Sequence, residues 1–486
     1  MTRTITIDPI TRLEGHGKVE IFLHDDGSVK DCFFQIPELR GFERFVVGRP
    51  IEELPRIVTR ICGVCPASHH MASAKAVDGC FGNEVAPLAH KLRDMYYHAH
   101  YIHSHIAHFY ALAAPDFVCG PDSDPAMRNI LGVVAKVGLA IGSQVIRARA
   151  MAQEIQQIMG GRSTHPVWCM PGGVSKGLSN AELEQIRPMV AELSKFADFS
   201  LQLFRDVVLK NDVYRDIIVA GPYTLDVHNM GLVDDNNAPN FYDGKVRVVD
   251  YEGKEICKYA PADYHHHVAE HVESWTYLKF PFLKQRGWKG FTEGRDSSIY
   301  CASPLARLNV ADRMATPRAQ EAFEEMFNTL GGHPCKALLA NHWARLVEMV
   351  QNAEMLERYC ADPEITGDTY RVIPRGITGE GVGVVEAMRG TLTHHYTCDE
   401  NGICTSANLI VGTTNNNAPI QMVTRKVARA LIKPGKDADQ GILNMVEMAF
   451  RAFDPCYSCA THSLPGQMPL EVHVYKGGAP YQQFIR

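Results

Sequence analysis

Two Cys-x-x-Cys pairs, one near each end of the 486-residue chain, constrain the fold more than any other sequence feature. The first pair is Cys62 and Cys65, and the second is Cys456 and Cys459. Each pair spaces two thiolates so that both can bind one metal. Four thiolates suit a soft or borderline metal such as zinc, nickel or an iron–sulfur cluster. If all four bind one centre, the two ends of the chain must meet inside the fold.

Spacing alone leaves three kinds of site open. A structural zinc site with four cysteines usually closes a short knuckle whose pairs lie some tens of residues apart, which disfavours a local zinc ribbon. A thioredoxin-like dithiol needs a single pair in a βαβ setting, which leaves the second pair unexplained. The third kind is a catalytic metal centre that ties the termini together. The isolated cysteines, such as Cys80, Cys257 and Cys360, are interpreted as small apolar fillers.

The composition excludes several classes of protein. Apolar residues make up 45% of the chain, which permits a sizeable core. The formal net charge is −6, so the composition does not have the excess of basic residues that is typical of a nucleic-acid-binding protein. The first residues lack the apolar stretch of a secretory signal. No uncharged apolar run reaches the roughly 18 residues of a membrane span. A cytoplasmic protein with no direct membrane span is therefore expected.

The pattern along the chain favours a mainly α fold, a large single unit with small peripheral β-sheets and both termini meeting at a central metal site. Residues 1–35 alternate like strands around the hairpin turn Asp25-Asp26-Gly27. Apolar periodicity predicts long helices at 87–113, 126–160, 181–212 and 317–360, the third capped by Asn180. The segment GVGVVEA at 381–387 is strand-like. The glycines of 379–383 are expected to form a turn, because they do not match a nucleotide-binding motif.

The residues around the two pairs carry a resemblance to a known family. Arg-Ile-Cys62-Gly-Val-Cys65-Pro-Ala-Ser-His and Asp-Pro-Cys456-Tyr-Ser-Cys459-Ala-Thr-His resemble the two signature motifs of the [NiFe] hydrogenase large (catalytic) subunit. The resemblance extends through DPITRLEGHGKVE at 8–20, LRGFERF at 39–45, HFYALAAPDF at 108–117, KFPFLK at 279–284, RLNVAD at 307–312 and RGTLTHHY at 389–396. The sequence of these segments is most similar to the cytoplasmic multi-subunit branch of the family. That branch includes NAD-reducing enzymes and methyl-viologen-reducing enzymes linked to heterodisulfide reductase.

This resemblance implies a nickel–iron centre at the four cysteines. Cys62 and Cys456 would be terminal nickel ligands, and Cys65 and Cys459 would bridge nickel to an iron that also carries carbon monoxide and two cyanides. The implied reaction is the reversible heterolytic cleavage of H2 to protons and electrons. Cys456 would accept the proton first, and Glu14 matches the family's proton-gate glutamate.

Further residues match the family's surroundings of the metals. Arg389 matches an arginine suspended over the centre, with Asp116 and Asp454 as the carboxylates that hold it. Thr413 matches a hydroxyl donor to a cyanide, and His69 matches a histidine that bonds the bridging thiolate of Cys65. One departure is Met388, which stands where the family usually has a proline that would fix φ before the arginine.

A second metal site and a processing step follow from the same resemblance. Glu43, His462 and a backbone carbonyl near Leu409 match the ligands of a structural magnesium or iron ion. The family's large subunits usually end at the histidine that matches His462. Residues 1–462 are therefore expected to form the mature domain, and the C-terminal extension 463–486 is expected to be removed on maturation.

The resemblance also implies partners. An iron–sulfur small subunit would take the electrons and pass them to further electron-transfer subunits, either heterodisulfide-reductase-linked or of diaphorase type. The sequence leaves NAD, heterodisulfide reductase with ferredoxin, and deazaflavin open as acceptors. An alternative in the same family is a regulatory subunit that senses H2, and the C-terminal extension speaks against it.

Overall fold

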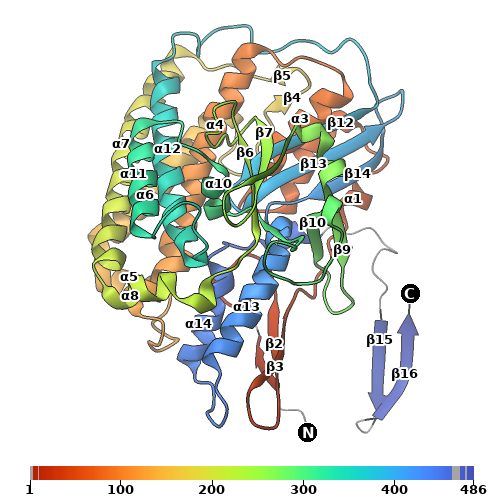
Figure 1. Ribbon diagram of the computed structural model, residues 1–486. Coiled ribbons are helices and arrows are strands. Elements are labelled where there is room, and N and C mark those ends of the chain that lie inside the picture. The colour runs from red at the N-terminus through yellow and green to blue at the C-terminus, as the bar shows by residue number, and fades with distance from the viewer. Residues whose placement is uncertain (1–3, 9, 462–470, 477–478, 486) are drawn as a thin grey trace.

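A computed structural model describes residues 4–8, 10–461, 471–476 and 479–485 (Figure 1). Four long helices pack against one another on one side of the molecule, and small sheets occupy the other side. These helices are α4 (Pro87–Ile106), α6 (Leu139–Gly160), α7 (Asn180–Phe204) and α12 (Asn341–Ala361). The prediction of a mainly α fold with small sheets is confirmed.

The helix boundaries differ from the predictions for local reasons. The helix predicted at 126–160 divides at Gly138 into α5 (Ile130–Val137) and α6, and the helix predicted at 317–360 divides into α11 (Pro317–Thr329) and α12. The second division contains Gly331 and Gly332, both with positive φ, which a helix does not accommodate. The predicted cap of α7 was one residue late: Ser179 caps it, in a capping box with Glu182.

The remaining helices are short or lie near the ends of the chain. They are α1 (Phe42–Phe45), α2 (Leu54–Ile57), α3 (Pro66–Cys80), α8 (Asp212–Val219), α9 (Tyr264–His267), α10 (Pro304–Val310), α13 (Asn417–Leu431), α14 (Gln440–Arg451) and α15 (Tyr457–Ala460). Helix α4 continues into π-helical turns over Ala107–Ala113 and Pro115–Cys119. No helix within the described ranges combines the length and apolar character needed to span a bilayer.

The strands form separate small sheets. Strands β1 (Thr4–Ile7), β2 (Lys18–Leu23) and β3 (Val29–Gln35) form an antiparallel meander. A second sheet has the order β11-β6-β7-β8 and a third the order β12-β13-β14. The bounds of the other strands are β4 (Cys169–Met170), β5 (Gly173–Val174), β6 (His228–Val233), β7 (Lys245–Val249), β8 (Glu255–Tyr259), β9 (Val268–Val272), β10 (Lys279–Leu283), β11 (Tyr300–Cys301), β12 (Glu380–Ala387), β13 (Gly390–Cys398), β14 (Cys404–Ile410), β15 (Glu471–Lys476) and β16 (Ala479–Ile485).

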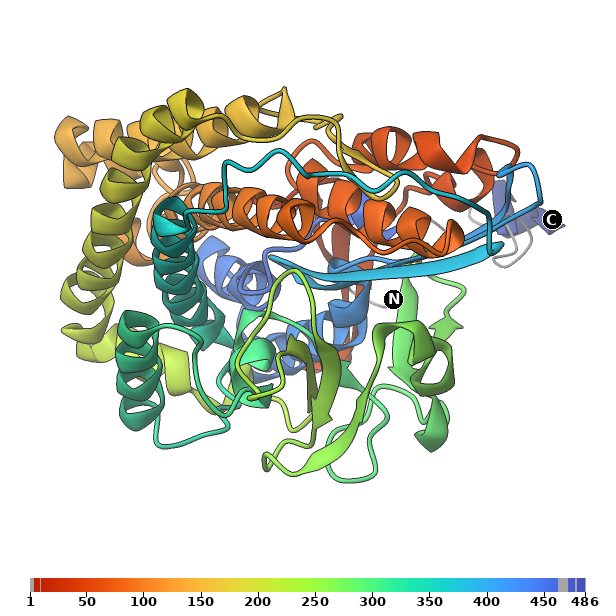
Figure 2. The ribbon, with the colours of Figure 1, turned by 90° about the horizontal axis from the view of Figure 1, so that it is seen from above.

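The glycine-rich segment 379–383 lies mostly in strand β12, so the strand expected at 381–387 is confirmed and the turn expected at 379–383 is wrong. A Cβ atom at Gly381 would lie 1.9 Å from Ala76 O, and one at Gly383 would lie 1.9 Å from Ala72 O. Both of these carbonyls belong to helix α3. The glycines therefore let the backbone of α3 lie directly on the β12–β14 sheet. Helix α4, orange in Figure 2, also runs alongside these blue strands.

The two ends of the chain meet as predicted. Glu14 forms an isolated parallel bridge with Cys456, in which Glu14 N donates to Pro455 O and Tyr457 N donates to Glu14 O. Near the same point Arg40 N donates to Thr461 O. These backbone bonds join the segments around Glu14 and Arg40 to the residues that follow α14, so the chain from Pro455 to Thr461 lies inside the fold.

Candidate metal centre

Four buried cysteines from the two ends of the chain come together at one point. Cys62 follows the 3-10 turn Val58–Ile61, Cys65 stands directly before α3, and Cys456 and Cys459 lie at the start and within α15. Their Sγ atoms all lie within 4.8 Å of one another. Within the described ranges this is the only group of three or more His, Cys, Asp or Glu side chains placed to hold a metal ion.

The four sulfur atoms crowd one another without forming a disulfide. Cys62 Sγ lies 3.3 Å from Cys456 Sγ, Cys65 Sγ lies 3.3 Å from Cys459 Sγ, and the Sγ atoms of Cys456 and Cys459 are 2.8 Å apart. Hydrogen bonds from Cys456 and its neighbours lower the pKa of Cys62, whereas burial raises the pKa of Cys456 and of Cys459. Such a cluster shares protons, and a soft cation that replaced those protons would meet four thiolate donors.

Glu14 is the carboxylate beside the cluster. Its Oε2 lies 3.0 Å from Cys456 Sγ and accepts a hydrogen bond from Ser458 N at 3.1 Å. The side chain is partly exposed, so it connects a buried sulfur with the region outside the cluster. In a structural zinc site the four protein ligands fill all positions on the metal, so a carboxylate beside one ligand sulfur has no function there.

Arg389 lies at the turn between β12 and β13 and reaches toward the same site. Its Nη2 forms an ion pair with Asp454 Oδ2 at 2.9 Å, and both side chains are buried. His108 Nδ1 lies 3.0 Å from the other oxygen, Asp454 Oδ1. Burial lowers the pKa of His108 to about 4. Burial alone would raise the pKa of Asp454, but Arg389 and the other positive groups lower it further, so the net shift of this pKa is downward. Arg389 Nε and Nη1 have no hydrogen-bond partner among the described residues.

Asp116 does not hold Arg389, contrary to the prediction. Its Oδ1 accepts from Arg12 Nη2 at 2.6 Å and its Oδ2 from Arg451 Nη1 at 2.7 Å. Asn444 Nδ2 adds a third contact at 3.1 Å. Because two other arginines occupy both oxygens, Asp116 instead ties the segment around Arg12 to helix α14.

Thr413 and His69 lie close to the cysteines. Thr413 Oγ1 accepts a hydrogen bond from Cys456 N at 3.0 Å, so it fixes the backbone of the second pair. His69 lies in the first turn of α3, and its Nδ1 is 3.1 Å from His394 Nε2. His69 Nε2 is buried and has no hydrogen-bond partner within the described ranges. The predicted bond from His69 to Cys65 stays a prediction.

Glu43 and Leu409 lie side by side in a second polar cluster. Glu43 Oε1 accepts from Leu409 N at 2.8 Å and lies 3.4 Å from Lys279 Nζ, which also pairs with Glu270. Burial raises the pKa of Glu43 to about 7. The third residue predicted here, His462, lies outside the described residues.

Two residues of the site were not predicted from the sequence. His108 stands at the start of the HFYALAAPDF segment, but nothing in its spacing distinguishes it from the histidines of the preceding helix α4. Arg307 lies in the RLNVAD segment and contacts the carbonyl groups that lead into Arg389. In both cases the partner is far away in the chain, so local patterns contain no signal.

Comparisons with known proteins agree with this geometry. A family model described as nickel-dependent hydrogenase matches residues 40–122 and 224–462, and one described as HoxL-like matches residues 4–39. The chain is 47% identical over 484 residues to an F420-non-reducing hydrogenase iron-sulfur subunit from Archaeoglobus profundus, covering 100% of this chain and 99% of that one. It is 37% identical to the NAD-reducing hydrogenase HoxS subunit beta of Cupriavidus necator, with 98% of each chain covered.

Solved structures show the same similarity in three dimensions. The crystal structure of an NAD+-reducing [NiFe]-hydrogenase in the H2-reduced state matches with a TM-score of 0.89 and 37% identity, covering 95% of this chain and 100% of that one. The Ni-Fe-Se hydrogenase of D. vulgaris Hildenborough in the reduced state matches with a TM-score of 0.76 and 26% identity, with 95% and 100% coverage.

Proposed function

The chain belongs to the nickel-dependent hydrogenase family and is the catalytic subunit of a [NiFe] hydrogenase, and from this premise we propose the roles of its residues. Cys62, Cys65, Cys456 and Cys459 would together hold the nickel–iron centre, Cys62 and Cys456 as ligands of nickel alone and Cys65 and Cys459 as ligands shared by the two metals. The observation that carries this assignment is the approach of all four Sγ atoms to within 4.8 Å. A catalytic role is preferred over H2 sensing, because the relatives named above are hydrogenases of catalytic type.

The centre, when bound, supplies the heterolytic cleavage of H2 to protons and electrons. The chain's own part is to remove the proton. Cys456 Sγ is the first acceptor, and Glu14 Oε2, at 3.0 Å, takes the proton from it. Ser458 N donates to the same carboxylate oxygen and keeps it facing the sulfur.

Arg389 and the groups around it complete the site. We assign its two unpartnered donors, Nε and Nη1, to a cyanide on iron, and Thr413 to the other cyanide. Asp454 orients the guanidinium through the 2.9 Å ion pair. His69, through its unpartnered Nε2, bonds the bridging sulfur of Cys65.

A structural magnesium or iron ion is proposed at Glu43, the Leu409 carbonyl and His462. Glu43 and Glu270 share the single ammonium group of Lys279, so one of the two negative charges is left without a partner that a bound cation would supply. Lys279 Nζ lies between Glu43 and Glu270 and would remain as their neighbour.

The chain's relatives are named as subunits, so other subunits take part in its function. We propose that an iron–sulfur small subunit is the direct electron acceptor and that the complex is cytoplasmic. The name of the NAD-reducing relative supports an NAD-reducing assembly. A heterodisulfide-reductase-linked assembly is proposed from the sequence resemblance alone. Residues 1–462 would form the working domain after removal of 463–486.

Metal analysis of the purified complex, combined with infrared spectroscopy, tests the proposal. We expect about one nickel per chain and sharp absorption bands from bound carbon monoxide and cyanide. A protein that contained zinc in place of nickel and showed no such bands would reject the nickel–iron assignment.

A further inference from the structure

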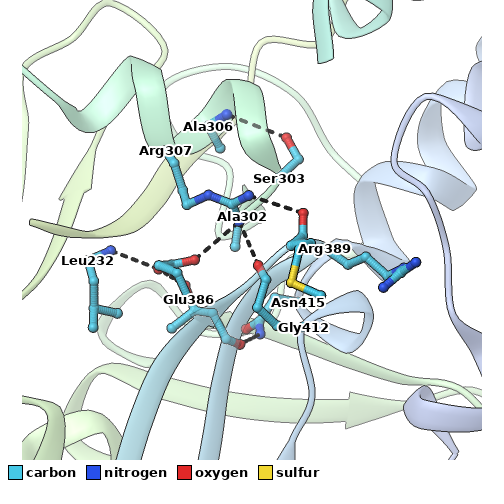
Figure 3. A network of polar contacts seen from close by, with 12 residues as sticks. Leu232, Ala302, Ser303, Ala306, Arg307, Glu386, Arg389, Gly412 and Asn415 are labelled. Atoms are coloured by element: carbon cyan, nitrogen blue, oxygen red, sulfur yellow. Dashed lines mark hydrogen bonds and ion pairs between the residues drawn. The ribbon is translucent and has the colours of Figure 1, made fainter. Parts of the chain in front are cut away.

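Four successive carbonyl oxygens, from Glu386 to Arg389, each accept a hydrogen bond from a side chain of another segment. Figure 3 shows Arg307 facing Glu386 and the residues that lead into Arg389. Residues 386–389 lead into and form the turn that carries Arg389. In chain order the bonds are Tyr97 and Tyr101 hydroxyls to Glu386 O at 2.7 and 2.8 Å, Arg307 Nη1 to Ala387 O at 2.9 Å, Arg307 Nη2 to Met388 O at 3.0 Å, and Asn416 Nδ2 to Arg389 O at 2.7 Å.

The backbone of the turn at Met388 and Arg389 does not have the conformation that a two-residue hairpin connection favours by itself. Ala387 and Gly390 are register partners, so Met388 and Arg389 form a two-residue connection between antiparallel strands. Such connections favour turns with a positive φ at their first central residue, because those turns match the strand twist. Neither Met388 nor Arg389 is among the residues with positive φ. The proline usual before the arginine is also replaced by Met388, so the loop depends on tertiary contacts.

Arg307 is placed to provide those contacts. It lies in α10, is fully buried, and has an acceptor for each of its five N–H donors. Nε and one Nη2 hydrogen form a bidentate pair with Glu348, at 2.6 and 2.9 Å. The other Nη2 hydrogen is donated to Met388 O. Nη1 donates one hydrogen bond to Ala387 O and one to Glu386 Oε2, the latter at 3.3 Å.

Each partner of Arg307 is itself fixed. Glu348 Oε2 lies 2.8 Å from His105 Nε2, so this carboxylate is held from α4 as well as from α12. Glu386 Oε1 accepts from Leu232 N at 2.7 Å and from Thr391 Oγ1 at 2.8 Å. The guanidinium therefore sits in a rigid frame and cannot shift toward solvent.

We infer that Arg307 is a positioning residue for the hydrogenase reaction: it clamps the Ala387 and Met388 carbonyls and so sets where the Arg389 guanidinium stands over the cysteines. It touches neither substrate nor metal. The inference rests on the proposed role of Arg389. Lysine cannot replace it, because an ammonium has three donors and no planar fork with which to hold a carboxylate and two carbonyls together.

The test compares Arg307→Lys with Arg389→Lys and a matched control in the assembled complex. Arg93→Lys is the control, since Arg93 is also fully buried, pairs with Asp78 and binds the carbonyls of Met170 and Gly173, away from the turn. Nickel content, thermal unfolding, kcat and KM for H2, and cyanide infrared bands are measured for each variant.

We expect Arg307→Lys to retain nickel, to shift or split the cyanide bands, and to lower kcat roughly 10- to 100-fold with KM for H2 unchanged. Arg93→Lys should lower the unfolding temperature without moving the bands or kcat. Unmoved bands and kcat in Arg307→Lys, with Arg389→Lys impaired, would overturn the inference alone. Normal bands and kcat in Arg389→Lys would overturn the proposed role of Arg389 instead.

Two further variants keep the inference testable if Arg307→Lys does not fold. Glu386→Gln must present its amide oxygen to Leu232 N and Thr391, which turns its NH2 group against Arg307 Nη1. A smaller band shift in the same direction is expected, and unchanged bands would count against the clamp. Met388→Pro, added to whichever variant is impaired, should partly restore the bands and kcat, because proline limits φ at the first turn position.

Discussion

The two cysteine pairs have the same spacing but opposite structural settings. Cys65 precedes the 15-residue helix α3, which is buried along most of its length. Cys62 Sγ accepts backbone N–H groups of its own loop, from Val64 at 3.2 Å and Cys65 at 3.4 Å. The first pair is therefore held by local backbone and by a long helix.

The second pair is held by residues far away in the chain. Helix α15 has four residues, and Asp454 before it has a φ of 53°, a conformation that few non-glycine residues adopt. Thr413 binds the backbone of Cys456, and Glu14 lies against its sulfur. Under the proposed roles, the first pair would mainly anchor the metals. The second pair, with Glu14 and Asp454 beside it, would accept the proton and orient Arg389.

The strongest test of a shared centre is Cys459→Ser. A serine hydroxyl is a poor donor to nickel and does not bridge as a thiolate does, so this variant should lose nickel and all hydrogen uptake. Metal analysis and uptake assays measure the effect. Cys360→Ser, at a buried free cysteine near the end of α12, should keep both. Normal nickel in Cys459→Ser would mean that the second pair is not part of the centre.

The asymmetry in proton transfer predicts a large effect of Glu14→Gln. The amide preserves shape but cannot take up the proton from Cys456, so turnover and H/D exchange should fall roughly 10²- to 10⁴-fold with nickel retained. Glu38→Gln, at an exposed glutamate 2.5 Å from His16, is the control and should be active. Unchanged exchange in Glu14→Gln would remove this residue from the proton path.

Asp454 and Asp116 can be separated experimentally, because only Asp454 contacts Arg389. Asp454→Asn should lower kcat at least tenfold while the fold is kept, since asparagine tolerates the positive φ. Asp116→Asn leaves Arg12 and Arg451 with an uncharged partner, so it should cost about 3 kcal/mol of unfolding free energy, with kcat largely retained. Denaturant unfolding and uptake assays distinguish the two. The reverse pattern would restore the sequence-based assignment of Asp116.

Sequence patterns were strongest where chemistry demands a residue type. The cysteines, Glu14 and Arg389 were found because their motifs are specific, and the geometry brings them together. The partners of buried charges were not found in the same way. Asp116 was assigned to the wrong arginine, and Arg307 was not assigned at all, because three-dimensional packing decides which of several buried arginines meets which carboxylate. The strand at 381–387 was expected, but its first glycines were assigned to a turn, because their close contact with the backbone of α3 leaves no signal in the local pattern.

The smallest expected effect lies at Thr413, which supports the second pair through a single hydrogen bond. Thr413→Val keeps the shape of the side chain but leaves Cys456 N without its acceptor at 3.0 Å, which should cost about 1–3 kcal/mol of unfolding free energy. If Thr413 also donates to a cyanide, one infrared band should move while the other stays. Thr413→Ser keeps the hydroxyl and should restore both properties. A stability loss with unmoved bands would limit Thr413 to supporting the backbone, and the second pair would then depend on distant residues for its position while Arg389 alone contacts the cyanides.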